Sequence, residues 1–179
     1  MDQDGTLLGW PGFGDEPPDA GIRSLSGLAS YALRRISEPA DLVAQSMGGV
    51  VALEATLRQP GLVRRLVLAG TSGGVDMKRF GAQDWRADYA REMPETAPRW
   101  FIDDRTDLTG ALPGISQPVL LLWGEDDKVS PPAVARYLQA LLPDAELVLV
   151  PGAGHMLAEE APDQVASAIA DFLGRTAVN

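Results

Sequence analysis

The chain has 179 residues, of which 45% are hydrophobic and 22% are charged, close to the averages for globular proteins. We therefore expect one folded domain over residues 1–179, and not a disordered, collagen-like or coiled-coil chain. The formal net charge of −10 argues against binding to nucleic acid, because an acidic surface repels phosphate groups.

Segments with helical spacing of apolar residues alternate with short, continuously apolar runs. In chain order they predict a helix at residues 24–36, a strand at 41–44, a helix at 50–58, strands at 66–69 and 119–123, a helix at 132–142, a strand at 147–150 and a helix at 161–173. Strands that are apolar on both faces are typical of a parallel sheet covered by helices on both faces. We therefore expect an α/β fold, with functional residues just past the carboxyl ends of its strands.

The numbers of cysteine and histidine residues and the lengths of the apolar runs argue against metal sites, disulfides and a membrane location. The chain has no cysteine, which excludes disulfides and thiolate metal sites, and one histidine, which disfavours a zinc site. No apolar run is long enough to span a bilayer, and no signal-peptide pattern opens the chain. We expect a soluble, cytoplasmic protein with no metal, no cofactor and no membrane contact.

The first candidate site follows the strand expected at residues 41–44. Residues 44–48 read Ala-Gln-Ser-Met-Gly, which places Ser46 between small residues at a strand-to-helix turn. Such a turn exposes the serine hydroxyl above the sheet, and the amide of Met47 at the start of the next helix can stabilise an oxyanion. The alternative is an ordinary serine that caps a helix in a Gly-rich turn.

Two further strand ends carry polar residues. Glu125, Asp126 and Asp127 follow the strand at 119–123, and His155 follows the strand at 147–150. A serine nucleophile needs a base, and the base needs a carboxylate that orients it. The chain order Ser, Asp, His is that of the α/β-hydrolase triad, and differs from the orders in chymotrypsin and subtilisin.

These segments resemble the α/β-hydrolase fold family. Residues 42–49 resemble its nucleophile elbow, 120–127 its strand followed by Trp-Gly-x-x-Asp, 151–159 its Gly-x-Gly-His loop, and 11–14 its Pro-Gly-x-Gly turn. The resemblance implies roles for Ser46 as nucleophile, His155 as base, Asp127 as acid and Met47 as oxyanion donor. It implies a serine hydrolase that cleaves a carboxylic ester or a related acyl substrate, closest to small esterases and carbon–carbon-bond hydrolases.

The sequence departs from this family before the Pro-Gly-x-Gly turn. There the family has further strands, one of which leads to the loop with the second oxyanion amide, whereas only ten residues precede Pro11. We therefore expect an N-terminally truncated sheet and reduced activity. In a second, weaker register, residues 8–12 resemble the His-Gly-Trp-Pro-Gly oxyanion loop without its histidine. The open edge of the strand at 41–44 could pair with a second copy in a homodimer.

Residues 76–116 stand where the family carries its lid, and we expect a small helical insertion there. The segment holds five aromatic residues. Trp85, Trp100 and Phe101, together with Trp10, are candidates for a pocket that binds a hydrophobic acyl substrate. The alternative is that these aromatic side chains form only the core of the lid.

Two other functions stay open. Residues Asp2-Gln3-Asp4-Gly5-Thr6 resemble the Asp-x-Asp-Gly-Thr motif of haloacid-dehalogenase-type phosphatases, in which the first Asp attacks phosphorus and an acidic cluster holds Mg²⁺. That motif ends a buried strand, however, and only Met1 precedes Asp2. The other hypothesis is a non-catalytic relic that keeps the three residues in a binding or interaction module.

Overall fold

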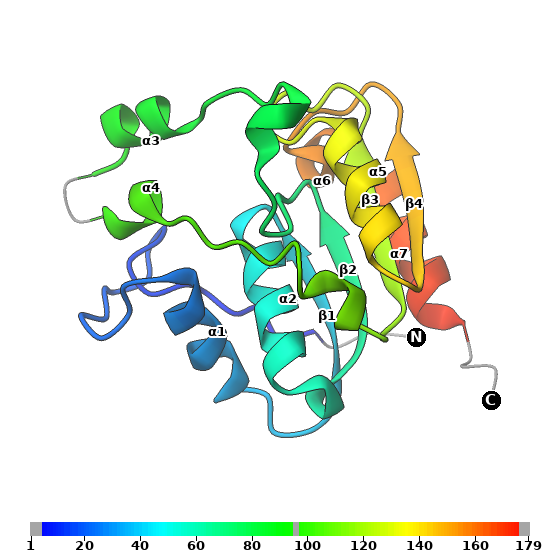
Figure 1. Ribbon diagram of the computed structural model, residues 1–179, viewed down its shortest axis with the longest axis horizontal. Helices are drawn as coiled ribbons and strands as arrows, with labels where there is room; N and C mark the ends of the chain where they lie inside the picture. The colour runs from blue at the N-terminus through cyan, green and yellow to red at the C-terminus, as the bar shows by residue number, and fades with distance from the viewer. Residues whose placement is uncertain (1–4, 95–96, 176–179) are drawn as a thin grey trace.

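A computed structural model describes residues 5–94 and 97–175 as a four-stranded sheet with surrounding helices (Figure 1). The strands lie in the order β1-β2-β3-β4, all parallel, and comprise β1 (Ala40–Gln45), β2 (Val63–Ala69), β3 (Val119–Gly124) and β4 (Ala145–Val150). The predicted α/β class is confirmed. Because the strands are parallel, their carboxyl ends meet at one edge of the sheet.

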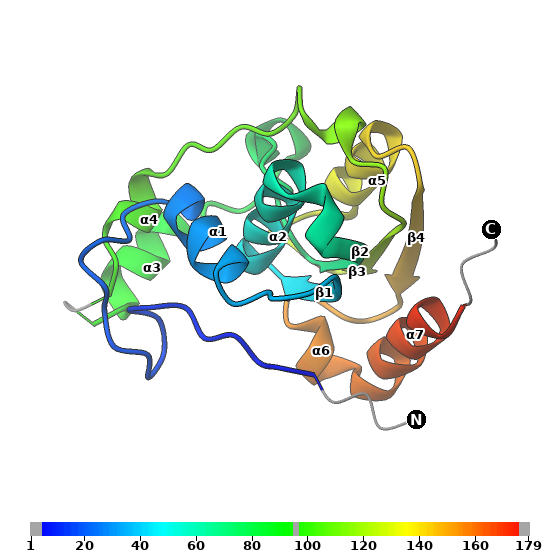
Figure 2. The ribbon, with the colours of Figure 1, turned by 90° about the horizontal axis from the view of Figure 1, so that it is seen from below.

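Helices cover both faces of the sheet (Figure 2). On one face lie α2 (Met47–Arg58) and α5 (Pro132–Leu141), with α1 (Leu25–Leu33) packed against α2, and on the other lies α7 (Pro162–Gly174). The shorter helices are η1 (Pro60–Leu62), η2 (Met77–Phe80), α3 (Arg86–Glu92), α4 (Trp100–Asp103), η3 (Leu112–Gly114) and α6 (Leu157–Glu160). None of the helices in the described ranges is long and apolar enough to cross a membrane.

The strand β2 starts at Val63, earlier than the apolar pattern predicts. The second residue of the strand is Arg64, whose guanidinium pairs with the carboxylate of Asp41 on β1 at 3.1 Å. Arg65 also lies on the strand, and its guanidinium donates to the carbonyl of Leu173 at 2.6 Å. The charged groups of both arginines thus have polar partners, and the strand can include these residues. A search for apolar runs leaves them out, because it excludes charged residues.

The indole of Trp123 positions the loop after β3. Trp123 is fully buried in the core cluster, and its N–H donates to the carbonyl of Ser130 at 2.7 Å. A buried indole N–H needs such a partner, because leaving it unpaired costs about 1–3 kcal/mol. The bond therefore anchors residues 124–130, which carry the acidic cluster, to the centre of the sheet.

The strand β1 lies at the edge of the sheet. In the described residues before it, 5–39, there is no strand, which agrees with the truncated sheet that the sequence predicts. Val43 in this strand is 54% exposed. Pairing of β1 with a second copy stays a prediction, which a monodisperse monomer in light scattering would contradict.

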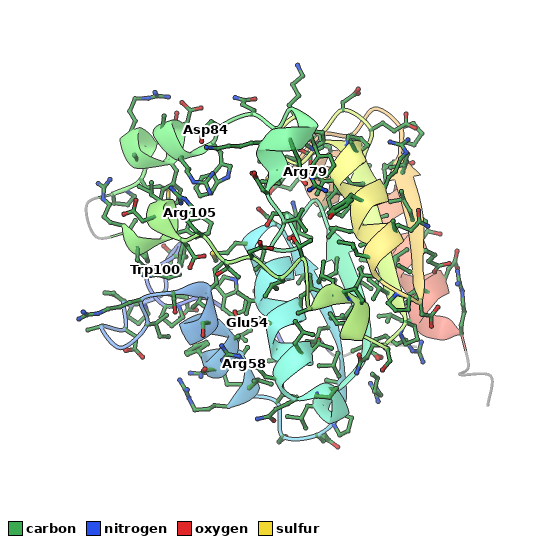
Figure 3. All side chains as sticks on the ribbon, viewed as in Figure 1. Glu54, Arg58, Arg79, Asp84, Trp100 and Arg105 are labelled. Carbon is green, nitrogen blue, oxygen red and sulfur yellow. The ribbon has the colours of Figure 1, made fainter. Side chains whose placement is uncertain are left out.

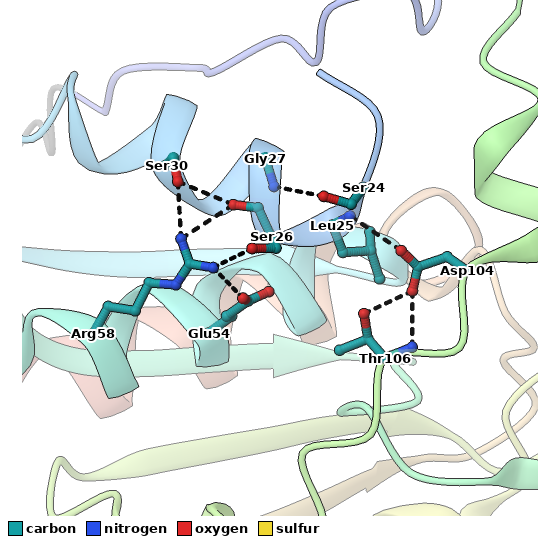
Figure 4. A network of polar contacts seen from close by, with 9 residues as sticks. All are labelled: Ser24, Leu25, Ser26, Gly27, Ser30, Glu54, Arg58, Asp104 and Thr106. Carbon is teal, nitrogen blue, oxygen red and sulfur yellow. Dashed lines mark hydrogen bonds and ion pairs between the residues drawn. The ribbon is translucent and has the colours of Figure 1, made fainter. Parts of the chain in front are cut away.

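The described part of segment 76–116 contains the short helices η2, α3, α4 and η3, of which α4 lies beside α1 (Figure 1) and η2 contacts α5. Asp104 attaches it to α1, because one carboxylate oxygen accepts the amide of Leu25 at 3.2 Å (Figure 4). The other oxygen accepts the amide and the hydroxyl of Thr106 at 2.9 and 2.7 Å. Asp104 thereby links residues 76–116, here named the lid segment after the position at which we expect a lid, to the first turn of α1.

A guanidinium joins α1 to α2 (Figure 4). Arg58 donates to the carbonyl of Ser26 at 3.1 Å and to the hydroxyl of Ser30 at 2.8 Å, and it also pairs with Glu54 on its own helix. Because α2 begins directly after the serine of the predicted elbow, this network fixes the helix behind that serine.

Candidate active site

Ser46 forms a strained turn between β1 and α2. Its φ of 52° and ψ of −122° make it the one non-glycine residue with positive φ in the described part of the chain. Such a backbone costs about 1–3 kcal/mol and persists only where neighbours hold it. The amide of Ser46 donates to the carbonyl of Ala69 at 2.9 Å, and its carbonyl accepts the amide of Gly49 at 3.0 Å. The predicted elbow is present.

The helix α2 begins at Met47, where the turn motif predicts the start of a helix, although apolar spacing alone begins at Val50. The pair Gly48-Gly49 hides the helical pattern from a sequence search, yet Gly49 is required, because a Cβ there would lie 2.6 Å from Oγ1 of Thr71. The first amides of a helix have no acceptor within it and carry the positive end of its dipole. The amide of Met47 is the first of these amides and directly follows Ser46 in the chain.

The three residues predicted from separate strand ends lie in one hydrogen-bonded chain. Nδ1 of His155 is 2.9 Å from Oδ2 of Asp127, and Nε2 of His155 is 3.1 Å from Oγ of Ser46. The serine follows β1, the aspartate follows β3 and the histidine follows β4. Parallel strands bring these ends to the same edge of the sheet, which is why residues up to 109 positions apart meet.

Asp127 differs from its acidic neighbours in burial. Asp127 is 3% exposed, whereas Glu125 and Asp126 are exposed. Its Oδ1 accepts the amides of Val129 at 2.9 Å and Ser130 at 2.8 Å, which leaves Oδ2 for the imidazole. This arrangement favours Asp127 as the carboxylate that orients the histidine.

Main-chain bonds hold the aspartate loop against the histidine loop. The amide of Asp126 donates to the carbonyl of Ala153 at 2.9 Å, and that of Glu125 donates to Val150 at 3.1 Å. The loops approach so closely at Gly124 that a Cβ there would lie 2.3 Å from the carbonyl oxygen of Ala153. Glycine is therefore required at this position by backbone contact.

Two residues that the sequence analysis did not predict also lie against the hydrogen-bonded residues Asp127 and His155. Gly70, at φ 49°, follows β2, and a Cβ there would lie 3.2 Å from Oδ2 of Asp127 and 3.5 Å from Nδ1 of His155. Gln45 donates from Nε2 to the carbonyl of His155 at 2.9 Å. The glycine directly after an apolar run was a usable signal for Gly70, whereas nothing in the sequence pattern indicated the partner of Gln45.

Ser46 and His155 line a cavity of about 760 Å³. Trp85, Tyr89 and Phe101 from the lid segment form an aromatic wall, in which Phe101 stacks on Trp85 with ring centroids 4.8 Å apart and meets Tyr89 edge-on at 5.5 Å. A volume of this size is in the range of small-molecule sites. Burial raises the pKa of the Tyr89 phenol, an effect that Arg99 opposes.

Two of the four aromatic residues predicted for the pocket are absent from the cavity lining. Trp10 packs beside α2, where a Cβ on Gly48 would lie 3.8 Å from its Cζ2. Trp100, labelled in Figure 3, packs edge-on against Phe13 at 6.1 Å. Neighbouring residues of a helix point about 100° apart, so α4 directs Phe101 to the cavity and Trp100 away from it.

Charged groups also line the cavity, which the sequence did not predict. Arg86 and Arg105 both donate to the carbonyl of Ile102, at 3.2 and 2.8 Å. Arg105 and Asp84 lie on the lid side of the molecule, away from α5 and α7 (Figure 3). The full charged set is Asp76, Lys78, Asp84, Arg86, Asp104, Arg105 and Asp107. The cavity thus combines an aromatic wall with both signs of charge.

The phosphatase-like motif gains no support from these observations. Asp2, Gln3 and Asp4 lie outside the described residues. The one buried acid of the 124–127 segment, Asp127, is held by the imidazole and two amides. Nowhere in residues 5–94 and 97–175 do three or more His, Asp or Glu side chains gather in a way that could hold a metal ion.

Comparison with known proteins shows the family of the chain. The model of a family described as the alpha/beta hydrolase family matches residues 4–168. The chain belongs to the alpha/beta hydrolase family. The resemblance that the sequence motifs carry is thus confirmed, and it extends over most of the chain.

Three relatives of this alpha/beta hydrolase give the scale of the similarity. The uncharacterized hydrolase YugF of Bacillus subtilis is 27% identical over 175 residues, covering 74% of this chain and 64% of that protein. A pimeloyl-[acyl-carrier protein] methyl ester esterase of Neisseria meningitidis is 27% identical over 190 residues, covering 81% and 73%. The solved structure of MGS-MChE2, an alpha/beta hydrolase from a lagoon-sediment metagenome, matches with a TM-score of 0.71 at 25% identity, covering 87% and 73%. The chain therefore spans between 64% and 73% of the length of these proteins.

Proposed function

We propose that this alpha/beta hydrolase is a serine hydrolase that cleaves a carboxylic ester, or a related acyl substrate, through an acyl-enzyme on Ser46. The observation that carries the proposal is the hydrogen-bonded chain from Asp127 through His155 to Ser46, with the serine on a strained turn at the wall of a cavity. A serine hydroxyl is a weak nucleophile unless a base takes its proton, and this geometry supplies the base.

The reaction begins when Oγ of Ser46 attacks the acyl carbon and Nε2 of His155 takes the hydroxyl proton. Asp127 accepts the Nδ1–H of the imidazole, which holds the tautomer that leaves Nε2 free and stabilises the imidazolium. The negative oxygen of the tetrahedral intermediate faces the amide of Met47. The intermediate then expels the alcohol, which receives the proton from His155, and a water molecule hydrolyses the acyl-serine by the same route.

The choice of substrate class rests on the cavity and on one relative. The Neisseria protein is named as a methyl ester esterase, which supports ester cleavage in this chain. The aromatic wall of Trp85, Tyr89 and Phe101 supports an acyl group with an apolar part. A small-molecule ester, with no nucleic acid or membrane partner, fits these features. A cytoplasmic location stays a prediction.

A second candidate is an alpha/beta hydrolase with little or no turnover that acts as a binding or interaction module. It is favoured by the sheet edge at β1, because the described residues contain no strand before it and Met47 is the one oxyanion donor we assign. Loss of one such donor lowers kcat by about 10²–10³-fold. The two candidates differ in turnover and share an activated serine.

Turnover of p-nitrophenyl acetate and butyrate, measured beside labelling by a fluorophosphonate, tests the proposal. We expect the wild type to hydrolyse the esters, and Ser46→Ala and His155→Ala to abolish hydrolysis. Ser37→Ala is the control, since Ser37 is exposed and lies outside the lining of this cavity, and it should keep activity. Labelling of Ser46 without turnover would favour the second candidate. Hydrolysis that survives Ser46→Ala would overturn both the nucleophile and the proposed reaction.

A further inference from the structure

Gln45 contacts the backbone of the same histidine whose ring meets Ser46. Its Nε2 donates to the carbonyl oxygen of His155 at 2.9 Å, which joins residues 110 positions apart. Ser46 is the next residue in the chain, and its Oγ lies 3.1 Å from Nε2 of His155. Two consecutive residues at the end of β1 therefore hold the main chain and the side chain of one histidine.

We infer that Gln45 is a positioning residue, which keeps the imidazole of His155 at proton-transfer distance from Ser46. The inference deepens the proposed function and rests on the roles proposed there for Ser46 and His155. Gln45 itself touches no reacting atom, so it acts through His155.

The need for such a bond follows from where His155 lies. It falls between the end of β4 at Val150 and the start of α6 at Leu157, outside any helix or strand, and its side chain is 21% exposed. Two other hydrogen bonds hold the main chain of this loop, and both act on residues that precede the histidine. They are the bond from Asp126 to the carbonyl of Ala153, at 2.9 Å, and the bond from the amide of Gly154 to the carboxylate of Glu160, at 2.6 Å.

The bond from Gln45 thus differs from these anchors in two ways. It acts on the histidine itself, and it ties the loop directly to the strand that presents the nucleophile. A displacement of about 1 Å between reacting groups can lower a rate by up to about 10²-fold. A fixed link between the base and the nucleophile's own strand limits that displacement.

The chemistry of the link requires an amide donor at the length of glutamine. A carbonyl oxygen is an acceptor only, so a glutamate carboxylate at this position would face it without a proton to donate. Methionine has a similar length and no donor. Gln45→Met therefore removes the hydrogen bond and keeps most of the packing.

Gln117→Met is the matched control. The side-chain amide of Gln117 also donates to a backbone carbonyl, that of Pro60, at 2.9 Å, and it lies away from the cavity. Both variants remove one amide-to-carbonyl hydrogen bond, and Gln117→Met also removes a buried Oε1 that has no hydrogen-bond partner in the described part of the chain. A purely structural role for Gln45 would make the two variants behave alike.

The experiment has two readouts on tag-free protein. The first is kcat and KM on p-nitrophenyl acetate, together with the rate of fluorophosphonate labelling. The second is the ¹⁵N–¹H imidazole spectrum, which reports on His155 alone because the chain has one histidine. For Gln45→Met we expect kcat and the labelling rate to fall about 10-fold with KM nearly unchanged. We also expect the Nδ1–H signal of His155 to broaden or shift in Gln45→Met and to stay unchanged in Gln117→Met, with a loss of Tm in Gln45→Met of about 2–4 °C, as for one lost hydrogen bond.

A wild-type rate and a wild-type imidazole spectrum in Gln45→Met would overturn the inference. Equal losses of rate in the two glutamine variants would also overturn it, because the effect would then follow stability. If wild-type protein hydrolyses no ester, the proposed function fails and the imidazole spectrum still decides: an altered Nδ1–H signal in Gln45→Met alone supports positioning, and an unaltered signal rejects it.

Discussion

The carboxylate of Asp127 lies 2.9 Å from Nδ1 of His155, and the aspartate side chain is completely removed from solvent. A buried carboxylate is costly unless hydrogen bonds compensate for its lost hydration. Here two backbone amides, from Val129 and Ser130, bind one oxygen, and the imidazole meets the other. The backbone of the loop therefore sets the direction in which the carboxylate faces the histidine.

Asp127→Asn is expected to lower kcat by about 10⁴-fold, because the amide presents a donor to Nδ1 and stabilises the wrong imidazole tautomer. The fold should stay intact, as checked by circular dichroism and Tm. Asp126→Asn is the control, since Asp126 is exposed, and it should keep nearly full activity. If Asp126→Asn abolished turnover and Asp127→Asn did not, the assignment of the acid would be wrong.

Gly70→Ala is expected to reduce turnover by more than 10-fold, because the new methyl group would press against the Asp127 and His155 contact. The positive φ adds a backbone cost of about 1–2 kcal/mol. Gly81→Ala separates the two effects, since Gly81 also has positive φ but open space around its Cα. Denaturant unfolding should show similar losses in both variants, and steady-state kinetics should show a loss only in Gly70→Ala. Equal activity would mean that the space at Gly70 is not needed.

Phe101→Ala is expected to weaken the preference for longer acyl chains, because this ring is at the centre of the aromatic wall of the cavity. Its half-buried side chain contacts several other rings, and we expect a loss of about 2 kcal/mol of stability. Trp100→Ala should also destabilise the lid segment while the ratio of kcat/KM for butyrate over acetate stays unchanged. A change in that ratio in Trp100→Ala alone would place the substrate elsewhere.

The sequence motifs predicted the three residues of the site because each follows an apolar strand, and the carboxyl ends of parallel strands share one edge. Strand ends were less predictable where polar residues belong to the strand, as with Arg64 and Arg65 in β2. The start of α2 at Met47 was predicted from the turn motif and not from apolar spacing, because Gly48 and Gly49 carry no apolar pattern. Such features depend on tertiary partners that a one-dimensional pattern does not contain.

The segment 76–116, where we expect a lid, is the part of the chain in which the sequence predicted the side-chain positions least well. Its helicity and aromatic content were predicted, yet only two of the four aromatic candidates, Trp85 and Phe101, line the cavity. The direction of a side chain on a one-turn helix such as α4 depends on how that helix docks. The docking here depends on Asp104 and its bond to the amide of Leu25, a contact between residues 79 positions apart.

Tyr89→Phe is expected to raise the free energy of unfolding by about 1 kcal/mol at pH 7. Among the described residues the Tyr89 hydroxyl is buried and has no hydrogen-bond partner, and an unpaired buried hydroxyl is destabilising. Burial also raises the pKa of this phenol above 10, so the unfolded chain loses its proton first as the pH rises. The advantage of Tyr89→Phe should therefore grow above pH 10 in urea unfolding. A destabilised variant at pH 7 would show that the hydroxyl has a partner in solution.

The central claim is that Ser46 becomes acylated with His155 as its base. Rapid quenching of the protein with p-nitrophenyl acetate, followed by peptide mass spectrometry, measures the acetyl group directly. We predict an acetyl group on the peptide that contains Ser46 in the wild type, at a level that falls strongly in His155→Ala. Release of p-nitrophenol with Ser46 unmodified throughout the time course would contradict the account.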